Sequence, residues 1–333
     1  MEHAILSGTE MNVSRIALGT WAIGGWMWGG SDEAESIRTI HAALDQGINL
    51  IDTAPVYGFG VSEETVGKAI EQRGRREEVF IATKVGLEWR NDSITRNSSR
   101  DRIRQEVQDS LRRLRTTYID IYQVHWPDPA VPIEETARTM RALHKEGLIR
   151  AIGVSNYSPE EMERFMSASE LHTVQPPYNL FERQIDRDVL PYVRDKGLSG
   201  LAYGPLCRGL LTGKMRPDTK FSGDDLRKSD PKFQPPRYAQ YLKAVEQLDD
   251  LAQKRYGKRV MDLAVRWVLD QPGISAALWG ARRPEQLKAV TDALNWKLDA
   301  DALAAIDQIL RQTITDPVGP EFMAPPARTT AAA

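Results

Sequence analysis

Four polar residues could carry out chemistry together because of their types and their spacing. Asp52, Lys84 and His125 close three successive apolar runs, and Tyr57 follows Asp52 within one short loop. A phenol has a pKa of about 10, so it transfers protons poorly at neutral pH unless a nearby ammonium group favours the phenolate. A carboxylate would hold that ammonium group, and a neutral imidazole can donate a hydrogen bond to a substrate oxygen. Such a set suits carbonyl reduction, in which the hydride must come from a cofactor.

Eight short apolar segments alternate with helical patterns along nearly the whole chain. The predicted strands span residues 16–19, 49–52, 79–83, 119–124, 151–154, 173–175, 199–203 and 275–279. This alternation favours an α/β fold of the (β/α)8 type, in which eight parallel strands close into a barrel. A doubly wound open sheet would give the same alternation, but no G-x-G-x-x-G follows the first strand. In a barrel the carboxyl ends of the strands meet at one rim, where the four polar residues would converge.

The helical patterns include residues 134–143, 241–255 and 261–269, and another helix begins near Ser99. Ser62 is predicted to cap the helix after the second strand. Three segments, 86–98, 215–238 and 314–333, are predicted excursions from the barrel. No linker divides the chain, so we expect a single barrel domain over 1–333 with a C-terminal helix. The Ala- and Pro-rich tail at 314–333 is expected to be partly flexible.

The composition excludes several classes of function. The 333 residues include 44 Lys+Arg and 46 Asp+Glu, for a formal net charge of -2. A balance this close to zero gives no general attraction to nucleic acid or to an anionic membrane. The single cysteine, Cys207, excludes an intramolecular disulfide and suits a reducing compartment. With no signal-like N-terminus and no metal-binding motif, we expect a cytoplasmic protein that is a monomer or a small homo-oligomer.

At this point the chain resembles the aldo-keto reductase superfamily over essentially its whole length. The segment DTAPVYGFGVSE at 52–63 is similar to the family's D-T-A-x-x-Y-G-x-G-x-S-E. Further ordered matches are IATK at 81–84, YIDIYQVHW at 118–126, IGVSNY at 152–157, YGPL at 203–206 and GLLTGK at 209–214. Many matches in the right order are a far more specific signal than any one of them. The resemblance is to bacterial NADPH-dependent members.

The resemblance implies reversible hydride transfer between NADPH/NADP+ and small aldehydes, ketones or alcohols. It implies a catalytic set of Asp52, Tyr57, Lys84 and His125, with Tyr57 as general acid and base. The implied cofactor contacts are Gly19, Thr20, Trp21, Asp52, Ser155, Asn156, Gln175, Tyr203, Gly204, Pro205, Leu206, Gly209, Leu211, Lys214, Gly280, Ala281, Arg282 and Gln286. The implied substrate contacts are Trp21, Tyr57, Trp89, His125 and Trp126. A pocket walled by Trp favours small carbonyl compounds, including short sugars and hydroxyaldehydes.

The match departs from the family pattern around the eighth strand. Trp279 stands where relatives commonly have Pro, and Ala289 and Val290 stand where they often have Glu-Asn at the adenine contacts. The family's site for the adenosine 2′-phosphate lies in this stretch. Ala281 and Arg282 could offer backbone amides and a guanidinium at the start of a helix, which is a good anion site. We therefore expect NADPH to be preferred over NADH.

Two other classes remain open from the sequence. Channel-associated β subunits share the expected fold and bind the same cofactor while acting on a membrane partner. The Tyr57, Lys84 and His125 set does not exclude this class, because those subunits can keep it. A barrel enzyme of another chemistry, such as a phosphate-binding isomerase, would leave the coincidence of the motifs unexplained.

Overall fold

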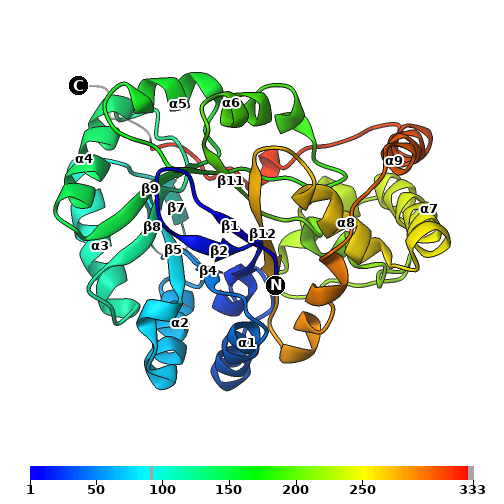
Figure 1. Ribbon diagram of the computed structural model, residues 1–333, viewed down its shortest axis with the longest axis horizontal. Coiled ribbons are helices and arrows are strands. Elements are labelled where there is room, and N and C mark those ends of the chain that lie inside the picture. Colours follow the sequence, from blue (N-terminus) through cyan, green and yellow to red (C-terminus); the bar gives the residue numbers. More distant parts are fainter. Residues whose placement is uncertain (91–92, 329–333) are drawn as a thin grey trace.

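The computed structural model describes residues 1–90 and 93–328, and its centre is a closed barrel of eight parallel strands (Figure 1). The strands follow chain order around the barrel: β3 (Ile16–Gly19), β4 (Leu50–Asp52), β5 (Phe80–Val85), β8 (Ile119–Val124), β9 (Ile149–Ser155), β10 (Thr173–Gln175), β11 (Ser199–Ala202) and β12 (Ile274–Gly280). The predicted barrel is therefore confirmed, and each predicted strand overlaps its observed counterpart.

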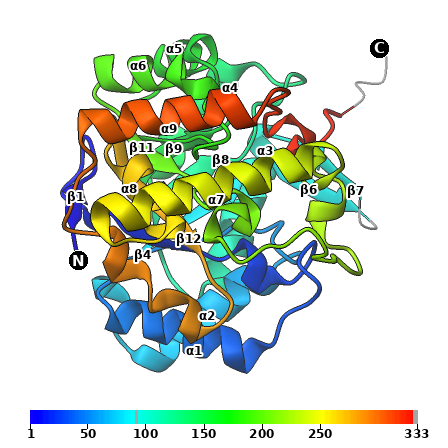
Figure 2. The same cartoon turned by 90° about the vertical axis from the view of Figure 1, so that its right-hand side faces the viewer.

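Helices surround the barrel in Figure 1 because each apolar stripe must cover the outer face of the strands. They are α1 (Glu33–Asp45), α2 (Val61–Arg73), α3 (Arg100–Arg113), α4 (Ile133–Lys145), α5 (Pro159–Met166), α6 (Val189–Asp195), α7 (Arg237–Tyr256), α8 (Val260–Leu269) and the C-terminal α9 (Ala300–Thr313). Figure 2 shows α9 lying along α7. Among the described residues, no helix is both long and apolar enough to cross a membrane.

A hairpin that the sequence did not reveal closes the amino-terminal end of the barrel. Strands β1 (His3–Ile5) and β2 (Asn12–Ser14) pair antiparallel, and the hairpin crosses the barrel in Figure 1. Leu6, Met11 and Val13 belong to a buried cluster with residues inside the barrel such as Leu50 and Ile121. The hairpin thus supplies the lowest layer of the interior core, which leaves the opposite end open for a site.

Two of the predicted excursions form walls at that open end. Residues 86–98 contain an antiparallel pair, β6 (Leu87–Arg90) and β7 (Ser93–Arg96). The described part of the tail, 314–328, returns across the mouth through a short 3₁₀ helix (Glu321–Met323). Arg96 holds it there, because its Nε donates to the Pro325 carbonyl at 2.9 Å and its backbone N–H donates to the Pro326 carbonyl at 3.2 Å.

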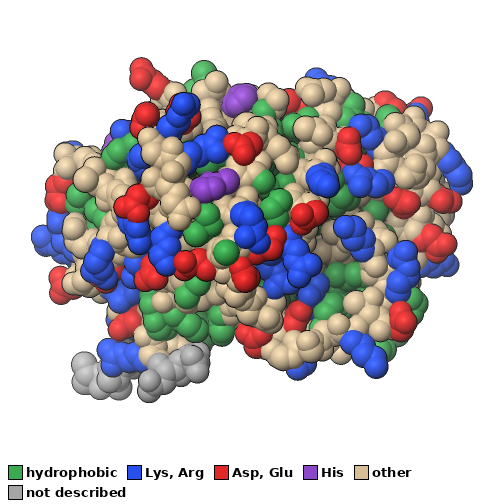
Figure 3. Space-filling view, turned by 90° about the horizontal axis from the view of Figure 1, so that it is seen from below, with side chains coloured by type: hydrophobic (Ala, Val, Ile, Leu, Met, Phe, Trp, Pro, Cys, Tyr) green, Lys and Arg blue, Asp and Glu red, His purple; other side chains and the backbone are tan. Residues whose placement is uncertain are grey.

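The surface carries both signs of charge. On the face seen in Figure 3, Lys and Arg side chains lie among Asp and Glu side chains rather than in one large patch of a single sign. This arrangement follows from a chain with nearly equal numbers of the two charges.

Candidate active site

Asp52 and Lys84 form a buried ion pair beneath the mouth of the barrel. Lys84 Nζ donates to Asp52 Oδ1 at 2.6 Å and to the Thr53 carbonyl at 3.0 Å. The other carboxylate oxygen accepts from Gln175 Nε2 at 2.7 Å and from Gln123 Nε2 at 3.5 Å. Burial lowers the pKa of Lys84, and the Asp52 carboxylate opposes that shift. Lys84 lies within β5 rather than after its end, because the strand continues to Val85 beyond the predicted boundary.

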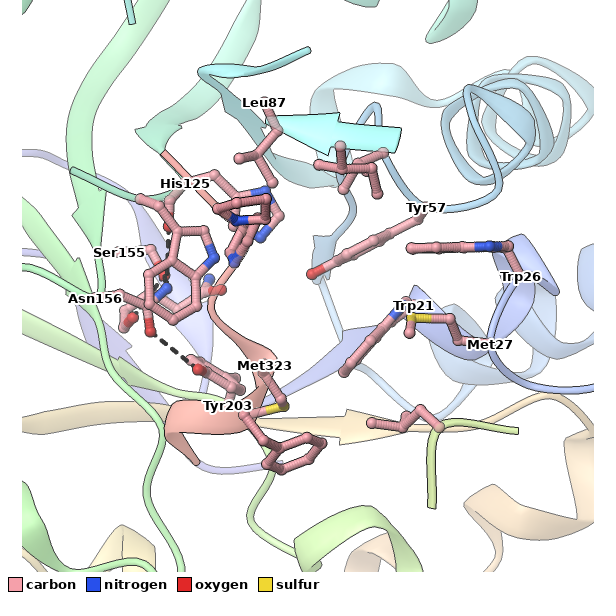
Figure 4. A pocket seen from close by; sticks show the side chains of 18 of the residues that line it. Trp21, Trp26, Met27, Tyr57, Leu87, His125, Ser155, Asn156, Tyr203 and Met323 are labelled. Carbon is pink, nitrogen blue, oxygen red and sulfur yellow. Dashed lines mark hydrogen bonds between the residues drawn. The ribbon is translucent and has the colours of Figure 1, made fainter. Parts of the chain in front are cut away.

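Tyr57 lies over this pair and faces a cavity. Lys84 Nζ is 5.1 Å from the centroid of the Tyr57 ring. Trp21 stacks on the ring at a centroid distance of 5.9 Å and an angle of 21°. His125, which follows β8, meets the ring edge-on at 5.9 Å and 81°. Figure 4 shows the Tyr57 hydroxyl pointing into the cavity toward the side where His125 lies. The four predicted catalytic residues are therefore brought together.

The turn after Tyr57 can be made only with glycine. Gly58 has a φ of 66°, and a Cβ atom built on it would lie 2.1 Å from the Gly24 carbonyl oxygen. The backbone of the loop after β4 therefore touches the backbone of the loop after β3. This close approach fixes Tyr57 relative to Trp21.

Ser62 does not cap α2 as predicted. Gly60 occupies the N-cap position, and the Ser62 hydroxyl lies inward, 2.8 Å from Thr20 Oγ1 and 2.9 Å from Thr53 Oγ1. Thr20 Oγ1 in turn donates to the Asp52 carbonyl at 2.8 Å. Because each hydroxyl has one proton, the bonds run from Thr53 through Ser62 and Thr20 to that carbonyl. This buried chain of hydroxyls joins the loop after β3 to the loop after β4.

The electrostatics of the site leave both His125 and Tyr57 uncharged. Burial, and then the charge of Lys84, lower the pKa of His125 well below its ordinary value, so the imidazole is neutral as expected. Burial, and then the Asp52 carboxylate, raise the pKa of Tyr57 well above its ordinary value. This direction is opposite to the lowering predicted from Lys84, because Asp52 offsets the ammonium charge and the phenol is desolvated. Tyr57 is therefore a neutral phenol, the form that can donate a proton.

A cavity of about 360 Å³ lies in front of Tyr57 and His125. Its wall includes the predicted Trp21 and Trp126, together with apolar residues that the sequence did not reveal: Met27, Val56, Leu87, Ile94, Leu226, Phe322, Met323, Pro325 and Pro326. Trp26 also lines it, whereas the predicted Trp89 does not. Trp89 packs instead against Phe59, at a centroid distance of 5.8 Å. Motif reasoning missed the tail residues because they have no fixed spacing from the catalytic set.

A second cavity of about 270 Å³ continues from the first, and the two share Trp21, Tyr57, Tyr203 and Met323. It is lined by most of the predicted cofactor contacts: Gly19, Thr20, Asp52, Gly204, Pro205, Leu206, Gly209, Gly280, Ala281, Arg282 and Gln286. Lys214 lines a further cavity that shares Leu206, Gly209, Gly280 and Gln286 with the second. The predicted Leu211 lines none of the three, because its side chain is fully buried in the core.

The remaining predicted cofactor contacts bond to one another, and Tyr203 lies where the first two cavities meet. Tyr203 OH donates to Asn156 Oδ1 at 2.9 Å, and Asn156 Nδ2 donates to the His125 carbonyl at 3.0 Å. Ser155 Oγ donates to the Gln175 carbonyl at 2.8 Å. All four side chains line the first cavity, and the hydrogen bond between Tyr203 and Asn156 is drawn as a dashed line in Figure 4.

The segment after β12 differs from the prediction. The expected helix is a 3₁₀ turn of four residues, Pro284–Leu287. The backbone N–H groups of Arg282 and Arg283 donate to Gln286 Oε1 at 2.7 and 3.0 Å, so one of the two amides predicted for an anion, that of Arg282, is already bonded. The Arg282 guanidinium donates to the Trp28 carbonyl at 2.7 Å. Only Lys288 and Ala289 separate this turn from the next 3₁₀ turn, Val290–Ala293, so no α-helix extends through the segment.

The connected cavities fit an elongated nicotinamide dinucleotide. Gly204 and Gly280 line the second cavity, and a Cβ atom on either would meet no atom within 4 Å, so both leave open space for a ligand against the backbone. The amide and hydroxyl groups of Ser155, Asn156 and Gln175 are donors and acceptors of the kind that a carboxamide needs. Within residues 1–90 and 93–328, no group of three or more His, Cys, Asp or Glu side chains is arranged to hold a metal ion.

A barrel with a lysine–aspartate pair, a tyrosine and a neutral histidine at its mouth defines a class of oxidoreductases that act on carbonyl groups. A sequence profile of the Aldo/keto reductase family matches residues 15–311, and the chain belongs to this family. Its members use nicotinamide cofactors for carbonyl reduction.

The chain is similar to well-covered relatives. It is 60% identical to the "Aldo-keto reductase YhdN" of Bacillus subtilis (strain 168), over 98% of this chain and 99% of that protein. It is 38% identical to the "NADH-specific methylglyoxal reductase" of Escherichia coli (strain K12), over 91% and 96% of the two chains. Among solved structures it is similar to the glycerol dehydrogenase AKR11B4 from Gluconobacter oxydans, with a TM-score of 0.88 and 54% identity over 97% and 99% of the two chains.

Proposed function

We propose that this chain reversibly transfers a hydride between NADP(H) and small aldehydes or ketones and the corresponding alcohols, with Tyr57 as the general acid and base. One observation carries the proposal: a neutral Tyr57 hydroxyl and a neutral His125 face one cavity, while the 2.6 Å Lys84–Asp52 pair lies behind the tyrosine ring. The nicotinamide cofactor supplies the hydride when it is bound.

The residues of the chain handle the substrate oxygen and its proton. The Tyr57 hydroxyl gives its proton to the carbonyl oxygen as negative charge develops there. Lys84 stabilises the phenolate that remains, and Asp52 keeps the ammonium group in position. His125 donates a hydrogen bond that orients the carbonyl. In the direction of alcohol oxidation, the Tyr57 phenolate accepts the proton.

A cluster of arginines supports a preference for NADPH. Burial, then the charges of Arg227 and Arg283, lower the pKa of Arg282, whereas Asp225 raises it, so Arg282 experiences repulsion from two like charges at the second cavity, which Arg227 and Arg282 line. A bound 2′-phosphate would relieve that repulsion. The E. coli relative is NADH-specific by its name, so both cofactors must be compared directly.

The substrate is proposed to be a small carbonyl compound such as a short sugar or hydroxyaldehyde. The names of two relatives, a methylglyoxal reductase and a glycerol dehydrogenase, refer to three-carbon compounds of this kind. We also propose a cytoplasmic monomer or small homo-oligomer that needs no metal, membrane or nucleic-acid partner. The near-zero net charge and the single cysteine support this assignment.

The test is a panel of aldehydes, ketones and alcohols assayed with NADPH and with NADH. Tyr57→Phe keeps the ring and removes the acidic hydroxyl, so we expect kcat to fall at least ~10²-fold while cofactor binding is nearly unchanged. Normal turnover by Tyr57→Phe would refute the assignment of the proton donor. A protein that binds NADPH but turns over no carbonyl would instead fit the cofactor-binding regulatory class, which resembles channel β subunits.

A further inference from the structure

The cavity in front of Tyr57 and His125 has an apolar wall. Its outer part is made of indole, thioether, aliphatic and proline groups, such as those of Trp126, Met323 and Pro325. Among the described residues that line it, none is Asp, Glu, Lys or Arg. A ligand in this cavity would therefore lose water without gaining an ionic partner from the wall.

Arg96 lies behind the wall and is already bonded. Its guanidinium carbon is 5.3 Å from the centroid of the Trp126 ring. Its Nε donates to the Pro325 carbonyl at 2.9 Å, and its Nη1 donates to the Pro127 carbonyl at 3.0 Å. These bonds tie together three segments that enclose the cavity. The charge of Arg96 is thus used to assemble the wall and is directed away from the space inside it.

Other cations around the mouth are offset by carboxylates of the chain. Arg328 donates to Asp128 Oδ2 at 3.0 Å, on the side of the tail. Arg227 Nε donates to Asp225 Oδ1 at 2.9 Å, on the side of the second cavity. Lys84 lies beneath Tyr57 and has its own carboxylate partner at 2.6 Å. None of these three provides an unneutralised positive charge for a substrate in the first cavity.

From this arrangement, and resting on the reductase function proposed above, we propose that the substrates are uncharged carbonyl compounds. The Tyr57 hydroxyl and His125 can donate hydrogen bonds to the carbonyl oxygen of a substrate. A carboxylate or phosphate elsewhere on the substrate would instead lose its water against aromatic groups. Burial of an unpaired charge is far more costly than burial of a neutral group of similar shape. The pocket therefore selects against anionic aldehydes that are otherwise small enough to enter.

The experiment compares kcat/KM for aldehydes that differ in charge and little in shape. The aromatic set is benzaldehyde, methyl 4-formylbenzoate and 4-formylbenzoate, and the aliphatic pair is succinic semialdehyde and its methyl ester. Each ester is larger than the matching carboxylate, so it controls for size. We expect the esters to be reduced at least ~100-fold more efficiently than the carboxylates, at saturating cofactor.

A variant with a new cation tests the reason for the selection. Ile94 lines the cavity from β7 and is only partly buried, so a lysine there can keep its ammonium group near the mouth. Ile94→Lys should raise kcat/KM for the carboxylate aldehydes at least ~10-fold relative to Ile94→Gln, the neutral control of similar length. The two variants should reduce the esters at similar rates.

The outcomes separate this proposal from the reductase function itself. Efficient reduction of the esters together with poor reduction of the carboxylates supports it. Equal reduction of both overturns the neutral-substrate class and leaves the reductase function intact. If kcat/KM for the carboxylate aldehydes is no higher in Ile94→Lys than in Ile94→Gln, the electrostatic explanation is overturned. Turnover of no aldehyde at all would overturn the proposed function and this proposal with it.

Discussion

Replacing Lys84 by Met tests whether the buried ion pair supports both stability and catalysis. Lys84 and Asp52 have side-chain exposures of 1% and 4%, and their charged atoms are 2.6 Å apart. Met keeps most of the volume of the side chain and removes the charge. The Asp52 carboxylate would then be left buried beside Tyr57 without its cation.

The expected loss of unfolding free energy follows from these contacts. Removing one partner of a buried ion pair typically costs about 3–5 kcal/mol. Asp52 would keep the hydrogen bond from Gln175 at 2.7 Å, which partly satisfies the remaining charge. We therefore expect a loss near the lower end, about 3 kcal/mol. Turnover should fall at least ~10²-fold, because the phenolate formed from Tyr57 would lack its ammonium neighbour.

The assay is urea unfolding combined with steady-state kinetics on four proteins: the parent, Lys84→Met, Asp52→Asn and the double variant. The Asp52→Asn substitution would leave no unpaired carboxylate in the double variant. Its loss of unfolding free energy should therefore be smaller than the summed losses of the two single variants, by about 2 kcal/mol. Its turnover should stay low, because the cation is still absent. Additive losses of stability would refute the coupling, and recovered turnover in the double variant would refute the role of Lys84.

Three further predictions concern the cofactor, the hydroxyl chain and a buried acid. Arg282→Ala should weaken NADPH binding about 10- to 150-fold and NADH binding only slightly, as measured by fluorescence quenching. Equal weakening of the binding of the two cofactors would mean that Arg282 only supports the 28–30 loop. Ser62→Ala should lower kcat about 10-fold. The control is Ser14→Ala, which should leave kcat unchanged; Ser14 is buried at the end of β2 and donates to the Ile16 carbonyl at 2.7 Å. An equal effect of the two variants on kcat would argue against positioning by Ser62. Burial raises the pKa of Glu106 to about 7, so the folded state keeps a proton that the unfolded state releases, and stability should fall as pH rises from about 4.5 to about 7. In Glu106→Gln the unfolding free energy should decrease over this pH range by up to about 3 kcal/mol less than in the parent. The same pH dependence of urea unfolding in both proteins would contradict this prediction.

The convergence of the catalytic set was predictable from the sequence. The alternation of eight strand and helix patterns favoured a closed barrel of parallel strands, and the carboxyl ends of parallel strands must meet at one rim of a barrel. Asp52, Lys84 and His125 lie at or next to those ends, and Tyr57 follows within a short loop. Local residue order and a general rule of topology were sufficient, so no long-range contact had to be known in advance.

The direction of the Tyr57 pKa shift required the tertiary structure. The types of the neighbouring residues suggested that Lys84 would lower this pKa, but burial and the Asp52 carboxylate raise it. Desolvation depends on how completely other side chains exclude water from one atom, and the balance of two opposite charges depends on their distances. Neither quantity can be read from the spacing of residues along the chain.

The wall of the cavity was also decided by the tertiary structure. Arg96 holds Pro325 from 229 residues away in the sequence, which places the tail against the cavity, while Trp89 turns toward Phe59 instead. The sequence thus determined the barrel and the reacting groups, because these follow from local periodicity and motifs. The tertiary structure decided which side chains enclose the substrate, because that choice depends on side-chain directions and on contacts between distant segments that no local pattern encodes.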